Sequence, residues 1–346
     1  MVTNNTQILF QQVPGKTYVP GQDLAAAQST IDLHAPLQEG EFILKNLVLS
    51  VDPYMRLYMA TGALQPGNIM AGNTMSVVLR SNNPDFQKDD LVYGLIAKGR
   101  FEQYSLVTAE YAKIAYQVRN QPKQTGLPLS NYVGVLGMAG MTAYAGLLKV
   151  GKPVAGETIL ISAASGAVGQ LVGQMAKNLG LRVVGSAGSD AKIRYLVDEL
   201  GFDGAFNYKT DDIDAKLTEL CPKGIDIYFD NVGGLMLEKA IDHANHFARI
   251  PVCGAITQYD DLKTGYPVSN LHQIMSKAIT IQGFHFTQYV DELETEFLDN
   301  VAKWLKDGSI KYAETVSNGI ETMPQALLDV LNGKTFGKGI VKVADL

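Results

Sequence analysis

The most regular hydrophobic pattern in this chain is an apolar run followed by a helical repeat. The run Thr158–Ile161 has the length and the branched side chains of a buried strand. Small residues follow, and apolar side chains then recur at helical spacing on one face, namely Val168, Leu171, Val172, Met175, Ala176 and Leu179. The pattern therefore predicts a strand, a tight turn and an amphipathic helix.

This alternation continues toward the carboxyl end. Further strands are predicted at 182–185, 204–208, 225–229, 248–252 and 278–281. A helix rich in Gly, Ala and Met precedes them at 137–144, and a long helix is expected near 290–306. Because helical segments lie between most of the strands, the fold class expected here is α/β, with a doubly wound parallel sheet.

The first part of the chain has a different texture. Apolar runs at 41–44, 76–79 and 90–93 are separated by Pro and Gly, which predicts a β-rich domain. Asp52-Pro53 predicts the start of a short helix, with Asp52 as its cap. The tail holds a helix at 323–331 and a strand at 339–343, so two domains are predicted: 1–135 with 311–346 returning to it, and 136–310.

The turn after the first strand has the composition of a dinucleotide-binding loop. Small residues let a pyrophosphate approach the backbone, and the helix that follows offers amide groups and a positive dipole. The candidate contacts are Ala163, Ser165, Gly166, Ala167, Val168 and Gly169. The alternative is that Gly166 and Gly169 only permit tight packing.

The end of the second strand indicates which dinucleotide binds. NAD-binding proteins usually carry an acidic residue there for the ribose hydroxyl, whereas this chain has Ser186-Ala187-Gly188-Ser189. Lys192 follows in the next helix, and a cation at that position suits a 2′-phosphate. NADP(H) is therefore the predicted cofactor; the alternative is that Lys192 is a solvated surface charge.

Composition excludes several other classes of function. The 346 residues are 46% hydrophobic and 18% charged, with a net charge of −6 and no basic run, which argues against a nucleic-acid partner. The polar start lacks a signal-peptide core, and no apolar stretch approaches the roughly 20 residues of a membrane span. Two cysteines, Cys221 and Cys253, make no disulfide framework, so we expect a cytoplasmic protein.

The ordered motifs of the chain resemble those of one superfamily. They are Ser50–Arg56 (SVDPYMR), 137–144 (GMAGMTAY), the 163–169 turn, 187–192 (AGSDAK), 207–209 (NYK), 230–234 (DNVGG) and 253–256 (CGAI). In this order they are similar to the medium-chain dehydrogenase/reductase superfamily, in its zinc-independent, NADPH-dependent alkenal/one double-bond reductase branch. The resemblance implies a GroES-like β domain, a Rossmann domain, a site in the cleft between them, and a homodimer.

The resemblance also assigns cofactor contacts. It implies that Lys192, Tyr208 and Ser189 bind the 2′-phosphate, although Ser189 alternatively only caps a helix. The remaining expected cofactor contacts are Asn231, Cys253, Gly254, Ala255, Ile256, Tyr259 and Phe284. Two positions depart from the family pattern: Ala139 replaces a usual proline, and Thr335 replaces the Asn that contacts the nicotinamide amide.

Two tyrosines are the candidate catalytic residues. Tyr259 follows a predicted strand at its carboxyl end, where open α/β sheets bind ligands. Tyr54 follows the Asp-Pro turn, and the resemblance favours it as a lining of the substrate pocket. The alternative for Tyr259 is a tyrosine in a surface loop, and the alternative for Tyr54 is an aromatic side chain that only packs. For the neighbouring residues we favour structural roles, with Asp52 as a helix cap and Arg56 in an ion pair.

Metal and hydrolase chemistry lack the necessary residues. Gly72-Asn73-Thr74 stands where zinc alcohol dehydrogenases carry Gly-His-Glu, and no cysteine lobe is present. His243 and His246 form a pair without a visible third ligand, and no Gly-x-Ser-x-Gly elbow occurs. No metal site is therefore expected.

The function expected from these features is NADPH-dependent reduction of the C=C bond of α,β-unsaturated aldehydes or ketones. Hydride attack on the β-carbon places charge on the carbonyl oxygen, and one or two hydrogen-bond donors such as Tyr259 can stabilise it without a metal. The alternatives are an NADPH:quinone oxidoreductase on the same scaffold and a non-catalytic NADPH-binding protein.

Overall fold

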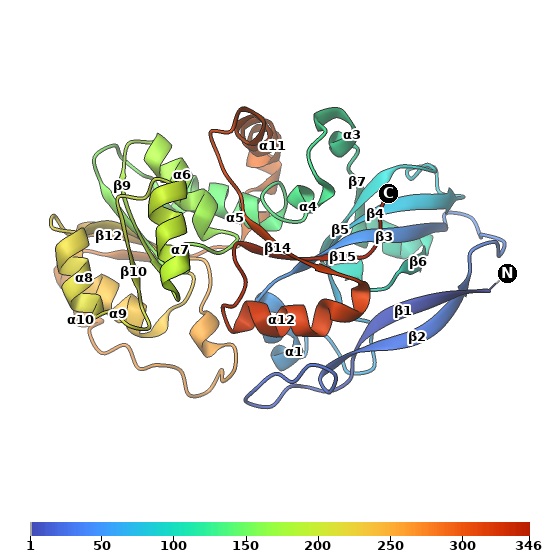
Figure 1. Cartoon of the computed structure of the whole chain (residues 1–346), viewed down its shortest axis with the longest axis horizontal. Helices are drawn as coiled ribbons and strands as arrows, with labels where there is room; N and C mark the ends of the chain where they lie inside the picture. The colour runs from blue at the N-terminus through green and yellow to red at the C-terminus, as the bar shows by residue number, and fades with distance from the viewer. Residues whose placement is uncertain (1) are drawn as a thin grey trace. The chain divides into compact units, whose positions relative to one another are not determined.

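The computed structural model describes residues 2–346 and divides the chain into two compact units (Figure 1). The first unit contains the chain up to Gly137 together with Glu314–Leu346, and the second is Met138–Ala313. Because the carboxyl-terminal segment belongs to the first unit, the chain leaves that unit once and comes back to it.

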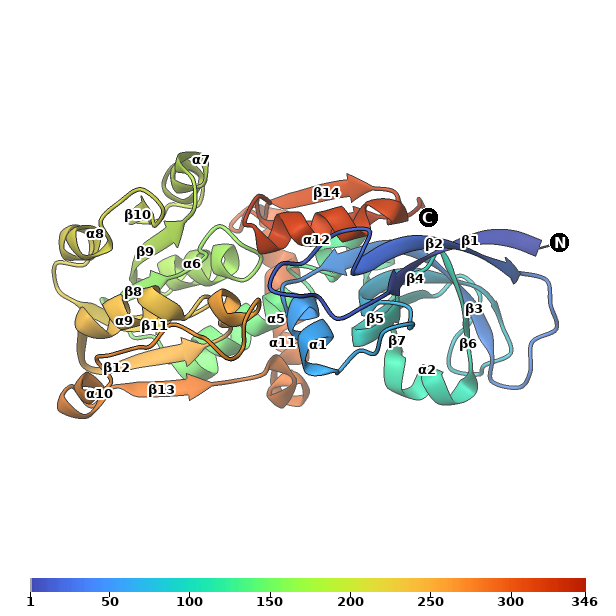
Figure 2. The same cartoon turned by 90° about the horizontal axis from the view of Figure 1, so that it is seen from below.

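The second unit is built on a six-stranded sheet whose neighbouring strands are all parallel. Its strands are β8 (Thr158–Ile161), β9 (Arg182–Ala187), β10 (Gly204–Asn207), β11 (Ile225–Phe229), β12 (Ala244–Val252) and β13 (Thr280–Gly283). The order β10-β9-β8-β11-β12-β13 can be followed from top to bottom in Figure 2. It reverses direction at β8, as in a dinucleotide-binding fold, so the predicted doubly wound sheet is confirmed.

Helices precede, connect and follow these strands. They are α5 (Met138–Ala145), α6 (Gly169–Asn178), α7 (Asp190–Arg194), α8 (Ile213–Leu220), α9 (Gly234–Asp242), α10 (His272–Ser276) and α11 (Val290–Asp307). π-Helical turns extend α5 through Gly146–Gly151 and α7 through Tyr195–Glu199. The predicted apolar face of α6 is buried or half-buried except at Leu179, which follows the last helical residue and is 42% exposed, so that assignment was wrong.

The first unit is mainly antiparallel. A hairpin of β1 (Val2–Phe10) and β2 (Leu24–Asp32) stands beside a seven-stranded sheet. The strands of that sheet are β3 (Phe42–Val51), β4 (Ala71–Ser81), β5 (Leu91–Arg100), β6 (Tyr104–Val107), β7 (Tyr116–Val118), β14 (Glu314–Asn318) and β15 (Lys338–Lys342). β15 pairs with the buried strand β3, so the carboxyl-terminal segment completes the sheet.

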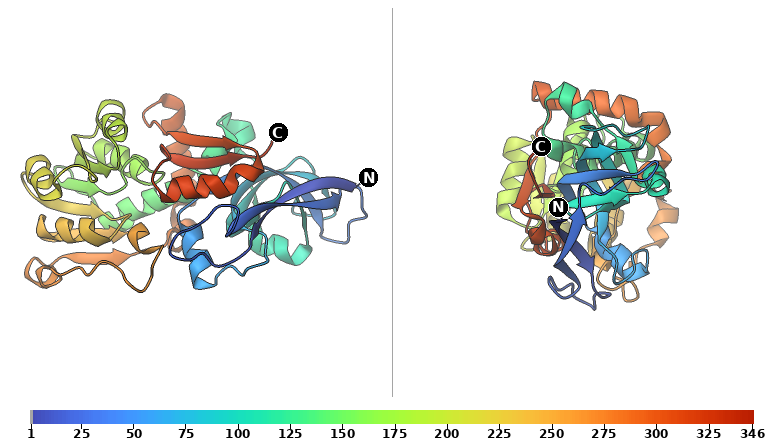
Figure 3. Two further views of the ribbon diagram at one scale, coloured as in Figure 1. Left: turned by 60° about the horizontal axis from the view of Figure 1, so that its bottom comes forward. Right: turned by 90° about the vertical axis from the view of Figure 1, so that its right-hand side faces the viewer.

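Short helices cover the sheet of the first unit. They are α1 (Tyr54–Thr61), α2 (Ala109–Ala115), α3 (Gln121–Thr125), α4 (Leu129–Tyr132) and α12 (Met323–Leu331). Figure 3 shows α12, in red, beside the blue amino-terminal strands. Met323 and Leu327 of α12 pack there with Phe10, Leu24 and Met55 in one core. In residues 2–346, none of the helices is both long enough and apolar enough for a membrane span.

The start of α1 differs from the expected cap. Pro53 occupies the capping position, and the Asp52 side chain makes no capping hydrogen bond. Instead, an Asp52 oxygen lies 3.1 Å from Nζ of Lys338, with both side chains buried. Ser50 donates a hydrogen bond to the same carboxylate, and Lys338 Nζ also donates to the carbonyl of Val51 at 2.7 Å. Asp52 therefore joins β15 to the beginning of α1.

Candidate active site

The glycine-rich turn of the second unit forms the tight connection that its sequence predicts. Ala164 N–H donates to the carbonyl of Ser186 on β9, which fixes the turn beside the neighbouring strand. A Cβ on Gly169 would lie 2.7 Å from both the Ala163 oxygen and the Ala164 Cα, so only glycine fits. No side chain caps α6, so the positive end of its dipole is open to an anion, although the N–H groups of Gln170, Leu171 and Val172 already bond to backbone carbonyls.

A second group of candidates lies where β9 and β10 end. A Cβ on Gly188 would lie 3.1 Å from both the Tyr208 hydroxyl and Cε of Lys209, so these side chains reach the Gly188 backbone. The Ser189 side chain makes no capping bond to α7, which is contrary to the capping alternative. Tyr208 and Lys209 are both exposed, and the Lys209 ammonium lies 5.9 Å from the Tyr208 ring centroid.

The charge of this group is positive. Burial lowers the pKa of Lys192, and the nearby Lys209 ammonium lowers that pKa further. A lysine whose charge is disfavoured by burial and by a second cation is a favourable setting for a dianionic phosphate. The sequence predicted Lys192 here but missed Lys209, although Lys209 directly follows Tyr208. Lys209 lies in the turn after β10, where its N–H donates a hydrogen bond to Asn207 Oδ1 at 3.2 Å.

A buried carboxylate shapes the turn after β11. Asp230 Oδ1 accepts hydrogen bonds from the Tyr228 hydroxyl at 2.7 Å, from Val232 N–H at 3.0 Å and from Gly233 N–H at 2.8 Å. Burial raises the pKa of Asp230 even though these donors oppose that rise. Asn231 was predicted from the sequence as a site residue, but Asp230, whose side chain holds the turn, was not.

Asn231 and Tyr259 meet at Gly254, beyond the ends of β11 and β12. Asn231 N–H donates to Ser162 Oγ at 2.9 Å, and its side-chain amide donates to the Ser162 carbonyl at 2.7 Å. A Cβ on Gly254 would lie 3.2 Å from the backbone carbonyl oxygen of Asn231 and 3.3 Å from the Tyr259 hydroxyl. The structure thus places the Tyr259 hydroxyl against Gly254, with the single helical turn Ile256–Gln258 between them in the chain.

Burial raises the pKa of the Tyr259 phenol, while a backbone hydrogen bond at Ala255 lowers it in part. Because the net shift is upward, Tyr259 stays protonated and keeps a hydrogen to donate. Burial, and then the charge of Asp230, raise the pKa of the neighbouring Cys253 thiol to about 12, so this thiol remains neutral.

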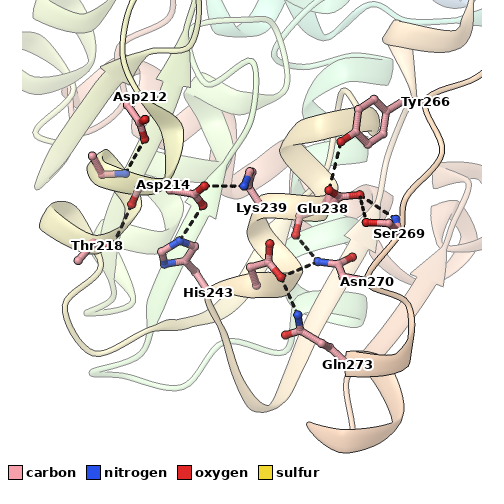
Figure 4. A network of polar contacts seen from close by, with 12 residues as sticks. Asp212, Asp214, Thr218, Glu238, Lys239, His243, Tyr266, Ser269, Asn270 and Gln273 are labelled. Carbon is pink, nitrogen blue, oxygen red and sulfur yellow. Dashed lines mark hydrogen bonds and ion pairs between the residues drawn. The ribbon is translucent and has the colours of Figure 1, made fainter.

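The chain beyond Tyr259 is attached to α9 (Figure 4). Glu238 accepts hydrogen bonds from the Tyr266 hydroxyl at 3.1 Å, from Ser269 N–H at 2.7 Å and from Ser269 Oγ at 3.1 Å. Asn270 donates to the Glu238 carbonyl and to Asp242 Oδ1. These bonds anchor the far end of the segment whose near end is Tyr259.

Phe284 follows the edge strand β13 and packs within the second unit. Its ring meets that of Phe229 edge to face, with centroids 6.2 Å apart. A Cβ on Gly146 would lie 2.3 Å from Phe284 Cζ, so the ring rests on the backbone of the π-helical turn.

Tyr54 belongs to the first unit, as the first residue of α1. Its ring packs edge to face on Tyr58, with centroids 5.0 Å apart, and its hydroxyl is buried. Within residues 2–346, that hydroxyl has no hydrogen-bond partner. Burial, and then the charge of Asp52, raise its pKa well above the usual value. Such an unsatisfied donor is costly unless a ligand completes it.

Thr335 also lies in the first unit and is half-buried. The chain next to it is fixed by Thr315, whose hydroxyl accepts from Phe336 N–H at 2.8 Å and donates to the Phe336 carbonyl at 2.7 Å. Arg56 is buried in the same unit, and its Nη2 donates to the Gly15 carbonyl at 2.8 Å.

The described part of the chain, residues 2–346, contains no group of three His, Cys, Asp or Glu side chains arranged to hold a metal ion. His243 closes α9 and lies 3.2 Å from Asp214 (Figure 4). His246 lies in β12 and is exposed, so the two histidines do not share a helix. Asn73, which is expected from the resemblance to stand at a zinc-ligand position, donates to the Gly94 carbonyl at 3.2 Å. These residues do not fit a catalytic zinc site.

Comparison with known proteins assigns the family. Residues 22–113 match the family described as the N-terminal domain of oxidoreductase, and residues 167–303 match the zinc-binding dehydrogenase family. The NADP(+)-dependent 2-alkenal reductase of Nicotiana tabacum is 42% identical over 99% of this chain and 98% of its own. The chain belongs to the medium-chain dehydrogenase/reductases, in the NADP-dependent alkenal and enone reductase branch. Similar relatives include (+)-pulegone reductase of Mentha piperita, 41% identical over 99% of both chains, and prostaglandin reductase 1 of Bos taurus, 40% identical over 90% of this chain and 92% of its own.

Solved structures agree with this assignment. CurA from Vibrio vulnificus, in complex with NADPH, is 34% identical, covers 99% of this chain and 100% of its own, and superposes with a TM-score of 0.87. The quinone oxidoreductase of Escherichia coli covers 97% of this chain and 99% of its own with a TM-score of 0.75, but at 18% identity it shows only the shared fold.

Proposed function

We infer that this protein reduces the C=C bond of α,β-unsaturated aldehydes or ketones with NADPH. The observation that carries the cofactor assignment is the pair Lys192 and Lys209 beside Tyr208, at a strand end without an acidic residue. Relatives over the whole chain, named as 2-alkenal and pulegone reductases, support the substrate class.

The cofactor contacts follow from the second unit. The turn at 163–169 and the start of α6 would hold the pyrophosphate, and Ser189, Lys192, Tyr208 and Lys209 would hold the 2′-phosphate. When bound, NADPH supplies the hydride. Gly254 would line the cofactor site, at a position where a Cβ would lie 3.2 Å from the backbone oxygen of Asn231 and 3.3 Å from the Tyr259 hydroxyl.

The two tyrosines would act on the substrate. As the C=C bond is reduced, negative charge collects on the carbonyl oxygen, and a hydrogen-bond donor placed there lowers the barrier. Tyr259 keeps its proton because burial raises the pKa of its phenol, so it can donate to that oxygen. Tyr54 would line the substrate pocket with a buried hydroxyl that lacks a partner in residues 2–346.

A substrate panel tests this function. Purified protein is mixed with NADPH or NADH and with 2-alkenals, cyclic enones, saturated aldehydes or quinones, and absorbance of the reduced cofactor is followed. We expect NADPH oxidation with alkenals and enones, with a saturated aldehyde or ketone as product. Turnover confined to quinones would favour the alternative oxidoreductase, and NADPH binding without any turnover would favour a non-catalytic role.

We also propose a homodimer. β13 is an edge strand, and all four of its residues are exposed, including Ile281 at 37%. An exposed edge with an apolar side chain is suited to pairing with a second copy of the same strand. Sedimentation analysis should give twice the 37.5 kDa chain mass, and Ile281→Lys should shift it toward the monomer. A monomer in the unaltered protein would contradict this.

We propose a cytoplasmic location because neither cysteine forms a disulfide in the structure. Cys221 and Cys253 are both free thiols in the structure, and burial raises the pKa of the Cys221 thiol to about 11. Free thiols are usual in a reducing compartment. Fractionation of the source cells with an antibody against the chain tests the location, and recovery outside the cytoplasmic fraction would contradict it.

A further inference from the structure

β5 of the first unit contains an irregularity that the cofactor site does not use. Its pairing with β4 places Gly72 opposite Gly99 and Thr74 opposite Gly94. Between these pairs, the single residue Asn73 on β4 faces the four residues 95–98 on β5. The strand therefore leaves the sheet and returns, and we call residues 95–98 the β5 excursion.

The neck of the β5 excursion is closed by two glycines. A Cβ on Gly94 would lie 2.8 Å from Gly99 Cα and 2.4 Å from Thr74 Oγ1, and a Cβ on Gly99 would lie 2.6 Å from the Gly72 oxygen. No larger residue fits at either position. Tyr111 of α2 donates to the Lys98 carbonyl at 2.7 Å, which fixes the returning end. The excursion is thus a defined feature of the fold, as bulges near binding sites often are.

The composition of the excursion is apolar where it leaves the sheet. Leu95, Ile96 and Ala97 follow one another and are each only partly buried, whereas the preceding residues of β5 are buried. Ala97 has a φ of 56°, which is unfavourable for a residue with a Cβ. Three adjacent, partly exposed apolar residues in a strained backbone leave apolar surface that a ligand can cover.

The excursion lies beside Tyr54. The backbone of Ala97 is near enough to the Tyr54 hydroxyl to affect its pKa, although no hydrogen bond between them is completed. The Oδ1 atom of Asn73, opposite the excursion, is also buried and has no hydrogen-bond partner within residues 2–346. The Tyr54 hydroxyl, a donor without a partner in residues 2–346, beside partly exposed apolar residues matches the chemistry of a carbonyl compound with an alkyl chain.

We propose that the β5 excursion is a specificity-determining wall that contacts the alkyl substituent of the enal or enone substrate. This inference rests on the proposed function. Leu95 and Ile96 supply the apolar contact, and Tyr54 marks the polar end of the same site. A longer substituent covers more of this surface, so the excursion should set how kcat/KM rises with substrate chain length.

The test compares Leu95→Ala/Ile96→Ala with the unaltered protein on 2-alkenals from three to ten carbons. Because the contact is partly exposed, we take the lower end of the range for apolar pockets, about a tenfold loss of kcat/KM for the longest alkenals. The shortest alkenal and the NADPH Kd should be unchanged. The control is Leu106→Ala on β6, which removes an exposed apolar side chain of the same sheet away from the excursion.

Two further variants keep the test decisive if the double variant folds poorly. Ile96→Val removes one methyl group and should reduce the chain-length dependence slightly, whereas Tyr54→Phe should lower kcat/KM equally at every chain length. A chain-length profile that is the same in the Leu95/Ile96 variants, in Leu106→Ala and in the unaltered protein would overturn the inference. Failure of the unaltered protein to reduce any alkenal would instead overturn the proposed function.

Discussion

Replacement of Lys192 by Ala should separate NADPH from NADH binding. Lys192 is half-buried beside Lys209, and burial lowers its pKa, so in the free protein the charge of Lys192 is held at a cost. A 2′-phosphate would relieve that cost and accept a charge-assisted hydrogen bond worth roughly 1.5–3 kcal/mol. At 1.4 kcal/mol per tenfold change, Lys192→Ala should weaken NADPH binding about 10- to 100-fold.

Lys209 should contribute less, because it is exposed. Exposed ion pairs are worth about 0.2–1 kcal/mol, so Lys209→Ala should raise the NADPH Kd by less than about sixfold. Neither variant should change the NADH Kd. The control is Lys216→Ala, which removes one positive charge from an exposed pair with Glu219 and should affect neither cofactor.

The pH dependence gives an independent check on the same group. The charged form of Lys192 binds phosphate, and its folded pKa lies below the usual lysine value. NADPH affinity should therefore fall as pH rises through that lowered pKa, while NADH affinity stays constant. Lys209→Ala removes a neighbouring positive charge, so it should move the fall in NADPH affinity to higher pH.

Fluorescence titration of both reduced cofactors from pH 7 upward measures these quantities directly. Equal losses of NADPH and NADH affinity in Lys192→Ala would refute the assignment of the 2′-phosphate to Lys192. A shift toward lower pH in Lys209→Ala would refute the electrostatic argument, even if the assignment were correct.

Three other predictions follow from the site and the fold. Tyr259→Phe should reduce kcat by up to about 10²–10³-fold with little change in the NADPH Kd, because the charge on the carbonyl oxygen develops mainly in the transition state; no change in either constant would make Tyr259 a bystander. Activity should survive dialysis against a strong chelator, with no stoichiometric zinc by elemental analysis, and activity restored only by zinc would contradict this. Lys338→Met should lower the free energy of unfolding, measured by urea denaturation, by about 3–5 kcal/mol, because it leaves the Asp52 carboxylate buried without its cation. The double variant Asp52→Asn/Lys338→Met should recover part of that loss. A double variant no more stable than the single one would show that packing, and not the unpaired charge, causes the loss.

The sequence by itself determined the elements whose signal is local. The predicted bounds of β8 and β11 match the structure, and so does the helix Met323–Leu331. Predominantly apolar runs define the two strands, broken only by Asp226 in β11, and such short buried segments need little help from the rest of the fold. The doubly wound sheet followed because strands and helices alternate regularly, and that order leaves few topologies.

Local signal was too weak where polar residues begin or end an element. β12 starts at Ala244 and includes the polar residues Asn245 and His246, which the prediction left outside the strand. Leu179 fitted the helical period but lies beyond the last turn of α6. Hydrophobic periodicity predicts which residues share the buried face of a helix, whereas the residue at which the helix ends depends on the elements packed around it.

Only the tertiary structure decided which distant residues meet. Asp52 fitted a helix cap by its neighbours in sequence, but the return of β15 places Lys338 beside it, and a buried cation is a stronger partner than a backbone amide. Lys209 became a candidate phosphate contact only because the structure places it near Lys192, which lies on another element. The β5 excursion is visible only as a mismatch of register with β4, because register is a property of two strands and not of either sequence alone.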